Sequence, residues 1–268
     1  MDFISATQIN SYLMCPLKYR FRYVDGIPAP WKPSTLAFGL SVHAALAWWH
    51  EKLMAGEKPD PDAASRIYLA DWEAQADGNL RYKKSETHES LRDLGRGLVD
   101  LYVQKMDGKL DVWQAEQGFE TPIIDPRTGE ELDFKLKGYF DVLTKDHGIL
   151  ELKTAGRAYT PDTLERMLQL SAYAYAYRQC MGTDPRITVV GLMKYKNPTI
   201  QFYEAFRPRE GDLWFAGLAL DIRRGVEHEV FPPNPGWMCG DCEYGRMCQE
   251  HYRDDEPTFQ ASVLAQPG

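Results

Sequence analysis

Two acidic residues and a lysine lie close together in the middle of the chain, in the segment LKGYFDVLTKDHGILELKT. Asp141 belongs to one stretch with the alternation of a strand, and Glu151 and Lys153 belong to the next. Partners on adjacent strands of a hairpin lie about 5 Å apart, and the two-residue period of a strand sets Glu151 and Lys153 on one face. The pattern therefore predicts two carboxylates and an ammonium group in one small space.

A group of this kind is suited to hold Mg²⁺ or Mn²⁺, because these ions prefer oxygen ligands and Mg²⁺ keeps several of its waters. A metal bound by Asp141 and Glu151 would polarise a phosphoryl oxygen and lower the pKa of a bound water. Lys153 would orient that water or stabilise the developing negative charge. Spacing alone leaves a second interpretation open, which is a cross-strand salt bridge on a solvated face.

Three of the five cysteines are bunched near the C-terminus, in WMCGDCEYGRMCQEHY. Cys239, Cys242 and Cys248 supply three ligands of a tetrahedral site, and the fourth must come from His251 or from a cysteine elsewhere. With His251 the site would be a local Cys₃His zinc site, and with four cysteines it would suit an iron-sulfur cluster. An odd, bunched set of cysteines favours a metal site in a reducing compartment over disulfides.

Composition is typical of a globular protein, which we expect in the cytoplasm. Hydrophobic residues make up 44% of the 268 residues, enough to bury a core. No apolar run approaches the ~18 residues that a membrane span needs, and the N-terminal MDFISATQIN lacks the regions of a secretory signal. Cys180, at the end of a predicted helix, is expected to be a small buried hydrophobic side chain.

The net charge of −8 argues against a broad electrostatic attraction to nucleic acid, since phosphates are neutralised by clustered Lys and Arg. A local groove is still compatible with this charge. Basic residues alternate with aromatic ones in KYRFRY (18–23), RYKK (81–84) and KYK (194–196). This mixture suits phosphate contacts and base stacking, and solvated faces are the alternative for each stretch.

The hydrophobic pattern predicts a helical N-terminal part. A first helix has Ser5 as its N-cap and ends near the Cys-Pro pair. Residues 35–54 form a long amphipathic helix, and residues 60–106 are helical with polar interruptions.

Farther along, strands and helices alternate. We expect helices at 160–182, with Pro161 in its first turn and Gly182 at its end, and at 208–225. Strands are predicted at 111–123, 133–145, 148–154, 186–196 and 199–206. This order predicts an α/β or α+β fold rather than a doubly wound nucleotide fold. The sequence has no glycine-rich phosphate loop, which argues against nucleotide hydrolysis.

Three motifs follow one another through this region. Asp141 ends GYFD, Glu151 and Lys153 lie in ELKT, and Gln169 and Tyr173 lie in QLSAY. The set resembles the PD-(D/E)xK nuclease superfamily, and within it the RecB-type branch with a cysteine-ligated iron-sulfur cluster, which includes CRISPR-adaptation exonucleases and AddB-type helicase-nuclease subunits. In that branch the Q-x-x-x-Y pair faces the metal and the DNA, so Gln169 and Tyr173 would position the lysine and the DNA.

Two N-terminal segments extend the resemblance. FGLSVHAAL has His43 where the branch has its upstream histidine, and SATQINSYLMCPLKYRF is similar to the segment whose Cys-Pro supplies the first cluster ligand. The resemblance therefore implies Cys15 as the fourth ligand of a 4Fe-4S cluster. With Cys239, Cys242 and Cys248 it would close a clasp between the N- and C-terminal segments.

The resemblance implies a PD-(D/E)xK restriction-endonuclease-like core, with a mixed central sheet flanked by helices. One RecB-like nuclease domain would span residues 1–253, with a helical insert at about 60–106 and the iron-sulfur clasp from residues 15 and 239–248. Residues 254–268 are expected to form a mobile tail.

The function that the resemblance implies is that of a metal-dependent DNA exonuclease. It would degrade single-stranded ends, 5′ to 3′ as relatives do, in DNA repair, recombination or CRISPR adaptation, with proteins of those systems as partners. Asp141, Glu151 and His43 would bind the metal, and Lys153 would activate the water. Two other functions stay open, namely a module that binds DNA ends without cutting and a structure-specific endonuclease.

Overall fold

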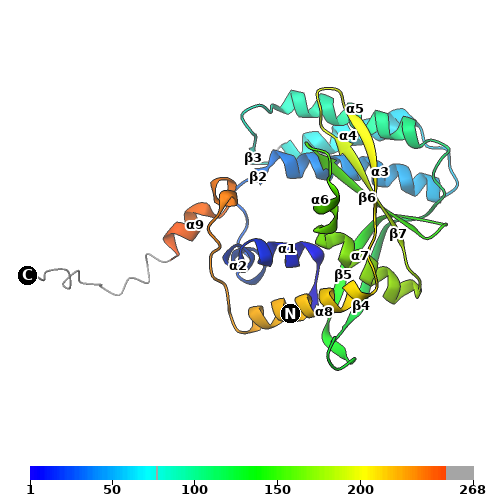
Figure 1. The fold of residues 1–268 in the computed structure, drawn as a ribbon. Helices are drawn as coiled ribbons and strands as arrows, with labels where there is room; N and C mark the ends of the chain where they lie inside the picture. The colour runs from blue at the N-terminus through cyan, green and yellow to red at the C-terminus, as the bar shows by residue number, and fades with distance from the viewer. Residues whose placement is uncertain (77, 252–268) are drawn as a thin grey trace, which may run out of the picture.

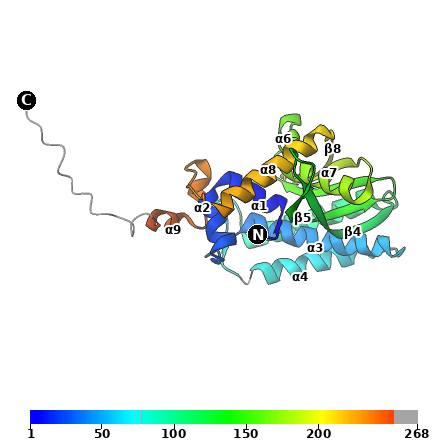
Figure 2. The same ribbon diagram turned by 90° about the horizontal axis from the view of Figure 1, so that it is seen from below.

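The computed structural model describes residues 1–76 and 78–251. The tail expected at 254–268, like the domain end expected at 253, lies outside these ranges. Of the helices described, none is both long and apolar enough to cross a bilayer. The chain folds into layers, with a central sheet between two groups of helices (Figure 1; Figure 2).

A mixed sheet of six strands forms the middle layer, in the order β1-β5-β6-β7-β8, and β4 also pairs with β5. Pairing is parallel for β1–β5 and β6–β7 and antiparallel for β4–β5, β5–β6 and β7–β8. The predicted mixed sheet flanked by helices is thus confirmed. The strands are β1 (Phe3–Ile4), β4 (Val112–Ile124), β5 (Glu131–Thr144), β6 (Gly148–Ala155), β7 (Arg186–Met193) and β8 (Thr199–Ala205).

One outer layer contains the helices predicted at 35–54 and within 60–106. Buried aromatic side chains of these helices, among them Trp49, Trp72 and Tyr102, pack in one cluster with Leu152 of the sheet. The expected insert is therefore an integral layer of the fold. The elements are α3 (Ser34–Met54), α4 (Pro61–Ala76) and α5 (His88–Met106), and the short strands β2 (Lys32–Pro33) and β3 (Leu80–Arg81) pair in parallel beside them.

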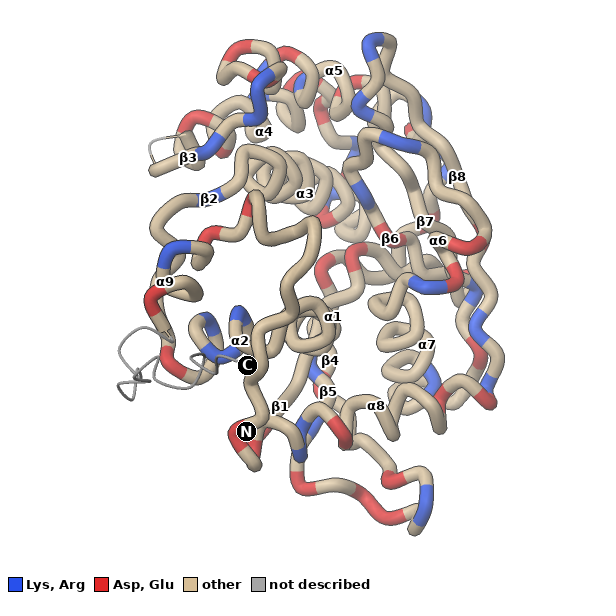
Figure 3. Tube along the Cα trace, turned by 60° about the vertical axis from the view of Figure 1, so that its left-hand side comes forward, with Lys and Arg blue, Asp and Glu red and all other residues tan. Residues whose placement is uncertain are grey.

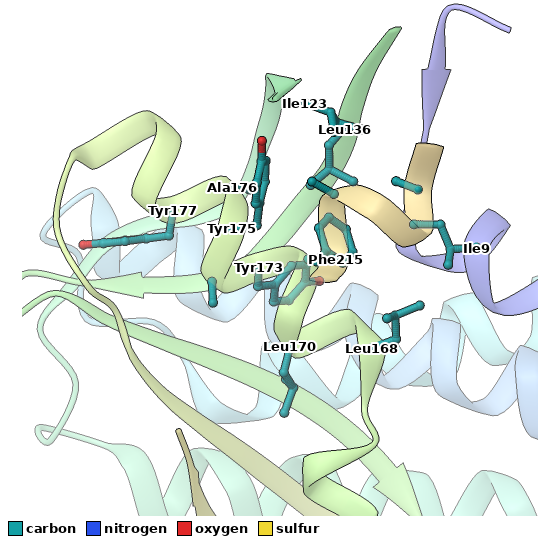
Figure 4. Close-up of a cluster of buried hydrophobic side chains, with 14 of the residues drawn as sticks. Ile9, Ile123, Leu136, Leu168, Leu170, Tyr173, Tyr175, Ala176, Tyr177 and Phe215 are labelled. Carbon is teal, nitrogen blue, oxygen red and sulfur yellow. The ribbon is translucent and has the colours of Figure 1, made fainter. Parts of the chain in front are cut away.

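The opposite layer packs around α7 (Figure 4). Tyr175 lies against Phe215 with ring centroids 5.5 Å apart, and its hydroxyl accepts the backbone N–H of Ile124 at 2.9 Å. Side chains of this layer and of the sheet thus form a second core. The helices are α1 (Ala6–Met14), α7 (Leu168–Met181) and α8 (Glu210–Glu227).

The single helix predicted at 160–182 is two helices, α6 (Pro161–Glu165) and α7. Met167 between them has extended dihedral angles, φ −71° and ψ 92°. The Arg207 guanidinium donates to the carbonyl oxygens of Leu164, Glu165 and Met167 at 2.5, 3.2 and 3.2 Å. This contact from a residue distant in sequence satisfies carbonyls that a helix break would leave unpaired, so the continuous helix was a wrong prediction.

The ends of that segment follow the prediction, apart from its cysteine. Pro161 begins α6, and Gly182 ends α7 in the left-handed conformation with φ 71°. Cys180 is exposed, so the prediction that it is buried was wrong. The buried stretch of α7 ends at Arg178, and the last turn of the helix extends past the sheet-facing core.

The N-terminal segment meets the C-terminal one at the side of the sheet (Figure 1). The predicted N-cap is confirmed, because the Ser5 hydroxyl accepts the N–H of Gln8 at 3.2 Å. Helix α1 ends where Cys15 becomes extended before Pro16, as X-Pro sterics require. Next come α2 (Pro16–Tyr19) and a π-helical turn, and the C-terminal α9 (Gly245–Glu250) lies near them.

Candidate active site

A fork in the sheet forms the floor of the candidate site. Strand β4 pairs along one edge of β5. On the other edge, β1 pairs with Lys135 and Leu136, and β6 pairs with Val142 and Leu143. Between these two partners, residues 137–141 face a gap in the described sheet. Side chains in this gap can meet a ligand that a continuous sheet would exclude.

Asp141 lies at the inner end of the gap. The β5–β6 register sets Val142 opposite Leu150, so one further step brings Asp141 opposite Glu151. Strand pairing stops there, and Oδ2 of Asp141 instead accepts the backbone N–H of Leu152 at 2.7 Å. The predicted proximity of the two carboxylates is therefore present, and the side chain of Asp141 takes the place of a main-chain acceptor.

Glu151 is fully buried and carries an unsatisfied carboxylate. Neither of its oxygens has a hydrogen-bond partner among the described residues, although the Lys153 ammonium is in ion-pair contact with Oε1. Burial, and then the nearby Asp141 charge, raise the pKa of Glu151 to about 7. Burial raises the pKa of Asp141 to about 6. Two buried carboxyls with such pKa values call for a cation, since desolvation disfavours their charged forms.

Lys153 is held by a chain of hydrogen bonds from α7. Its ammonium donates to Oε1 of Gln169 at 2.7 Å, and Nε2 of Gln169 donates to the Tyr173 hydroxyl at 2.7 Å. The four-residue spacing puts both side chains on one helix face. Tyr173 is buried, and its ring packs against Phe140 with centroids 5.2 Å apart. Tyr173 is thus a core residue, as Figure 4 shows, and its hydroxyl is also the end of a polar chain to the site.

His43 reaches the site from α3. Its Nε2 lies 3.0 Å from the carbonyl oxygen of Leu152, and its Nδ1 lies 3.7 Å from Oδ1 of Asp141. Burial lowers the pKa of His43, which favours the neutral imidazole. The carbonyl contact fixes the proton on Nε2, so the Nδ1 lone pair faces the carboxylate. Two lone-pair donors directed at one another are arranged to hold a cation between them.

Glu116 completes this group, and the sequence did not identify it. Ligand atoms of His43, Glu116 and Asp141 all lie within 4.8 Å of one another. Glu116 falls opposite Asp141 in the β4–β5 register and has a positive φ of 47°, which is uncommon for a residue other than glycine. Burial, and then the charge of Glu151, raise its pKa.

A register shift explains why Glu116 was missed. Near the turn, Ile124 pairs with Glu131, and counting back evenly from there would set Gln114 opposite Asp141. An irregularity between Pro122 and Ile124 changes the register, and Glu116 arrives at that position instead. Turn position and alternation, the signals available in the sequence, do not reveal such a shift.

His43, Glu116, Asp141 and Glu151 together form what we call the carboxylate centre, and their ligand atoms suit a divalent cation. Carboxylate oxygens and a neutral imidazole are ligands for Mg²⁺ or Mn²⁺, and the unsatisfied oxygens of Glu151 add a further hard donor. An aqueous cleft of about 920 Å³ opens onto the centre, and Asp141, Gln169 and Tyr173 are among the residues that line it. A substrate can therefore reach the carboxylates from solvent.

All four predicted cluster ligands come together at a second site. Cys15, Cys239, Cys242 and Cys248 line one pocket of about 240 Å³. His251 packs its ring edge-on against Phe21, with centroids 5.6 Å apart. The two chain ends are joined here by the Tyr244 hydroxyl, which donates to the Ile27 carbonyl at 2.8 Å, and by the Lys18–Glu243 ion pair at 2.7 Å.

The spacing of the thiols is wider than one ion requires. A zinc ion binds thiolates at about 2.3 Å, which sets the sulfurs of a tetrahedron about 3.8 Å apart. In the described part of the chain, the one group of three or more ligand atoms within 4.8 Å is that of His43, Glu116 and Asp141. Burial raises the pKa of Cys242 and of Cys248, so a positively charged centre would be needed to hold them as thiolates.

The basic-aromatic stretches have mostly structural contacts. Lys18 pairs with Glu243, the Arg81 guanidinium lies 4.7 Å from the Trp31 ring centroid, and the Lys194 ammonium lies 5.1 Å from that of Phe38. Figure 3 shows basic and acidic residues interspersed along the chain. The expected groove of alternating basic and aromatic residues does not form at the carboxylate centre from these stretches.

The chain belongs to the PD-(D/E)XK nuclease superfamily, whose family model matches residues 4–249. Members of this superfamily are phosphodiester hydrolases that use divalent metals, in agreement with the donor set of the carboxylate centre. A search of curated proteins gave no significant match.

Two solved structures resemble this one. A presumed exonuclease from Eubacterium rectale has a TM-score of 0.55 and 14% identity, and the match covers 100% of this chain and 91% of that chain. It has the same fold. The structure of SSO0001 has a TM-score of 0.37 and 13% identity, with 90% of this chain and 94% of that chain covered.

Proposed function

We propose that this protein is a metal-dependent deoxyribonuclease that degrades single-stranded DNA ends from 5′ to 3′. The observation that carries the proposal is the group of His43, Glu116 and Asp141, whose ligand atoms lie within 4.8 Å of one another, beside the unsatisfied carboxylate of the buried Glu151. Membership of a nuclease superfamily supports hydrolysis of a phosphodiester. The name of the Eubacterium rectale structure supports action on chain ends.

Each residue of the centre has a distinct part in this proposal. Asp141 and Glu151 would hold the metal with His43 and Glu116, and the metal would supply a polarised phosphoryl oxygen and a water of lowered pKa. Lys153 would orient the attacking water and stabilise the negative charge that develops on the phosphate. The hydrogen bond from Lys153 to Gln169 fixes the ammonium in position, and Tyr173 fixes the amide of Gln169.

The test uses linear and circular DNA in the same reaction. Single-stranded linear DNA labelled at either end should be degraded with Mg²⁺ or Mn²⁺, and a single-stranded circle should remain intact. The label position at early times reports the polarity. Linearised circles would support the structure-specific endonuclease instead, and binding without any degradation would support the end-binding module.

We also propose that the four cysteines hold a 4Fe-4S cluster that joins the two ends of the chain. The common pocket of the four thiols supports a shared centre, and four thiolates are the ligands of such a cluster. Of these thiols, which all lie in the part of the chain that the structure describes, no three lie within 4.8 Å of one another, which favours a cluster over a single ion. Anaerobically purified protein should be brown and contain iron and sulfide. A colourless protein with one zinc per chain would overturn this assignment.

A further inference from the structure

One exposed aromatic ring stands in the cleft beside the carboxylate centre. Tyr139 is 64% exposed, although it lies within the sheet, and it lines the cleft together with Asp141. It is two residues from Asp141 on β5 and so shares its face, about 6.6 Å along the strand. That separation is similar to the step from one nucleotide to the next along a single strand.

Phe119, the aromatic residue next to Tyr139 on the opposite face of the sheet, has a role in packing. Phe119 of β4 lies over Gly138, where an added Cβ would meet the ring at 2.6 Å. Its ring centroid is 4.6 Å from that of Phe140 and 6.1 Å from that of Tyr173. Phe119 is therefore part of the packing around α7, and Gly138 is the residue that admits it.

Tyr139 has a glycine partner but no such packing. It pairs with Gly118 across the strands, and an added Cβ on Gly118 would lie 3.2 Å from Cε1 of the Tyr139 ring. The ring is thus backed by main chain on one side, while most of its surface faces the cleft. A supported aromatic ring with a free face is the platform that unpaired bases stack on.

The charged groups near this ring lie beside an apolar surface. Lys137 is the basic residue next to Tyr139 on the same face, and it pairs with Glu120 at 2.8 Å. Glu120 also pairs with Lys135 at 2.8 Å. Two ammonium groups share one carboxylate, so this wall keeps a net positive charge that favours a phosphate, while Phe3 and Leu40 extend its apolar surface.

We propose that Tyr139 forms a stacking subsite for an unpaired nucleobase adjacent to the phosphate that a metal at Asp141 would hold. The proposal rests on the nuclease function above and names the part of the substrate that the cleft recognises. A base paired in a duplex has its faces covered by its neighbours, so the subsite selects single-stranded nucleic acid or a frayed end.

The experiment measures binding to two strands that carry the same phosphates, one of thymidine nucleotides and one of abasic spacers, with Ca²⁺ in place of the catalytic metal. Tyr139→Ala should weaken binding of the thymidine strand about tenfold, as expected for one lost stack. It should leave binding of the abasic strand unchanged. Tyr139→Phe keeps the ring and should bind both strands as the wild type does.

Phe206→Ala is the matched control, because Phe206 is an exposed ring, at 82%, outside the residues that line the cleft. An equal loss on both strands for Tyr139→Ala, or no loss on either, would overturn the subsite. Wild-type cleavage is measured in parallel. If the wild type cuts single strands normally while Tyr139→Ala binds as before, only the subsite fails; if the wild type neither binds nor cuts them, both proposals fail.

Discussion

The carboxylate centre takes Asp141, Glu151 and Lys153 from two adjacent strands, whereas the cysteine pocket joins Cys15 to a triplet from the other end of the chain. The first is set into a sheet with large cores on both faces. The second rests on a small cluster whose fully buried members are Leu17, Phe21 and Tyr244.

The two sites should affect the stability of the fold in opposite ways. The sheet holds the carboxylates in place whether or not a metal is bound, and the burial of the Glu151 carboxylate without hydrogen bonds opposes folding. The cysteine pocket has little apolar packing of its own, so a group bound by the thiols would contribute much of its stability. Changes at the first site should remove function and spare the fold, and changes at the second should do the reverse.

The largest expected effect is that of Glu151→Gln. The neutral amide has the shape of the carboxylate but binds a metal poorly, so DNA cleavage should fall by about a thousandfold. The melting temperature of the metal-free protein should stay the same or rise, because the raised pKa of Glu151 means that desolvation of its charged form outweighs its attraction to Lys153. Glu204→Gln, at an exposed position on β8, should change neither quantity. A marked loss of stability in Glu151→Gln would contradict the contrast.

Cys15→Ser should have the second largest effect, on stability. We expect loss of the brown colour and a fall in unfolding free energy of about 3 kcal/mol or more, typical of a lost metal centre. Cys180→Ser, which alters an exposed cysteine outside the pocket, is the control and should leave colour and stability unchanged. Full colour in Cys15→Ser would show that the clasp is closed by another ligand.

A pH series tests the buried carboxyls of the metal-free protein. Because the folded pKa of Glu151 is raised to about 7 and that of Asp141 to about 6, the folded chain holds protons that the unfolded chain has released. Stability from these groups is full below about pH 4 and is lost as pH rises through 6 and 7. Burial lowers the pKa of His43 and lowers that of His50 to about 3, so the contribution of the histidines rises over the same pH range. The Glu151 contribution is therefore the difference in unfolding free energy between wild type and Glu151→Gln, which should fall by about 2 kcal/mol between about pH 5 and pH 8.

The series on Glu151→Gln is the reference, since the variant keeps the histidines and loses the Glu151 titration. Mn²⁺ affinity of the wild type should rise over the same pH range, because metal ligation requires the deprotonated carboxylates. A wild-type stability that increases from pH 5 to pH 7 relative to that of Glu151→Gln, in the absence of metal, would contradict the assigned direction.

The smallest effect is expected for Glu116→Gln. Glu116 lies at the edge of the donor group with His43 and Asp141, and its loss leaves the other ligands in place. Mn²⁺ affinity should fall about tenfold, the lower range for loss of a supporting group, and the rate at saturating metal should change little. A Mn²⁺ titration of the cleavage rate separates the two quantities. Complete inactivity at saturating metal would make Glu116 as important as Asp141.

The sequence by itself determined the elements and the principal motifs. Alternation predicted the strands that hold Asp141, Glu151 and Lys153, and the four-residue spacing placed Gln169 and Tyr173 on one helix face. These signals are local, because strand and helix periods depend on residues close in sequence. The helix start at the Ser5 cap and the stop before Pro16 have the same local origin.

Tertiary structure decided what the local pattern does not contain. The break between α6 and α7 depends on Arg207, and the approach of Glu116 to Asp141 depends on a shifted register. Tyr139 became a candidate subsite because the sheet forks around it and leaves its ring exposed. These features arise from contacts between residues far apart in sequence, whose relative positions are set by the packing of whole layers and not by the neighbours of each residue along the chain.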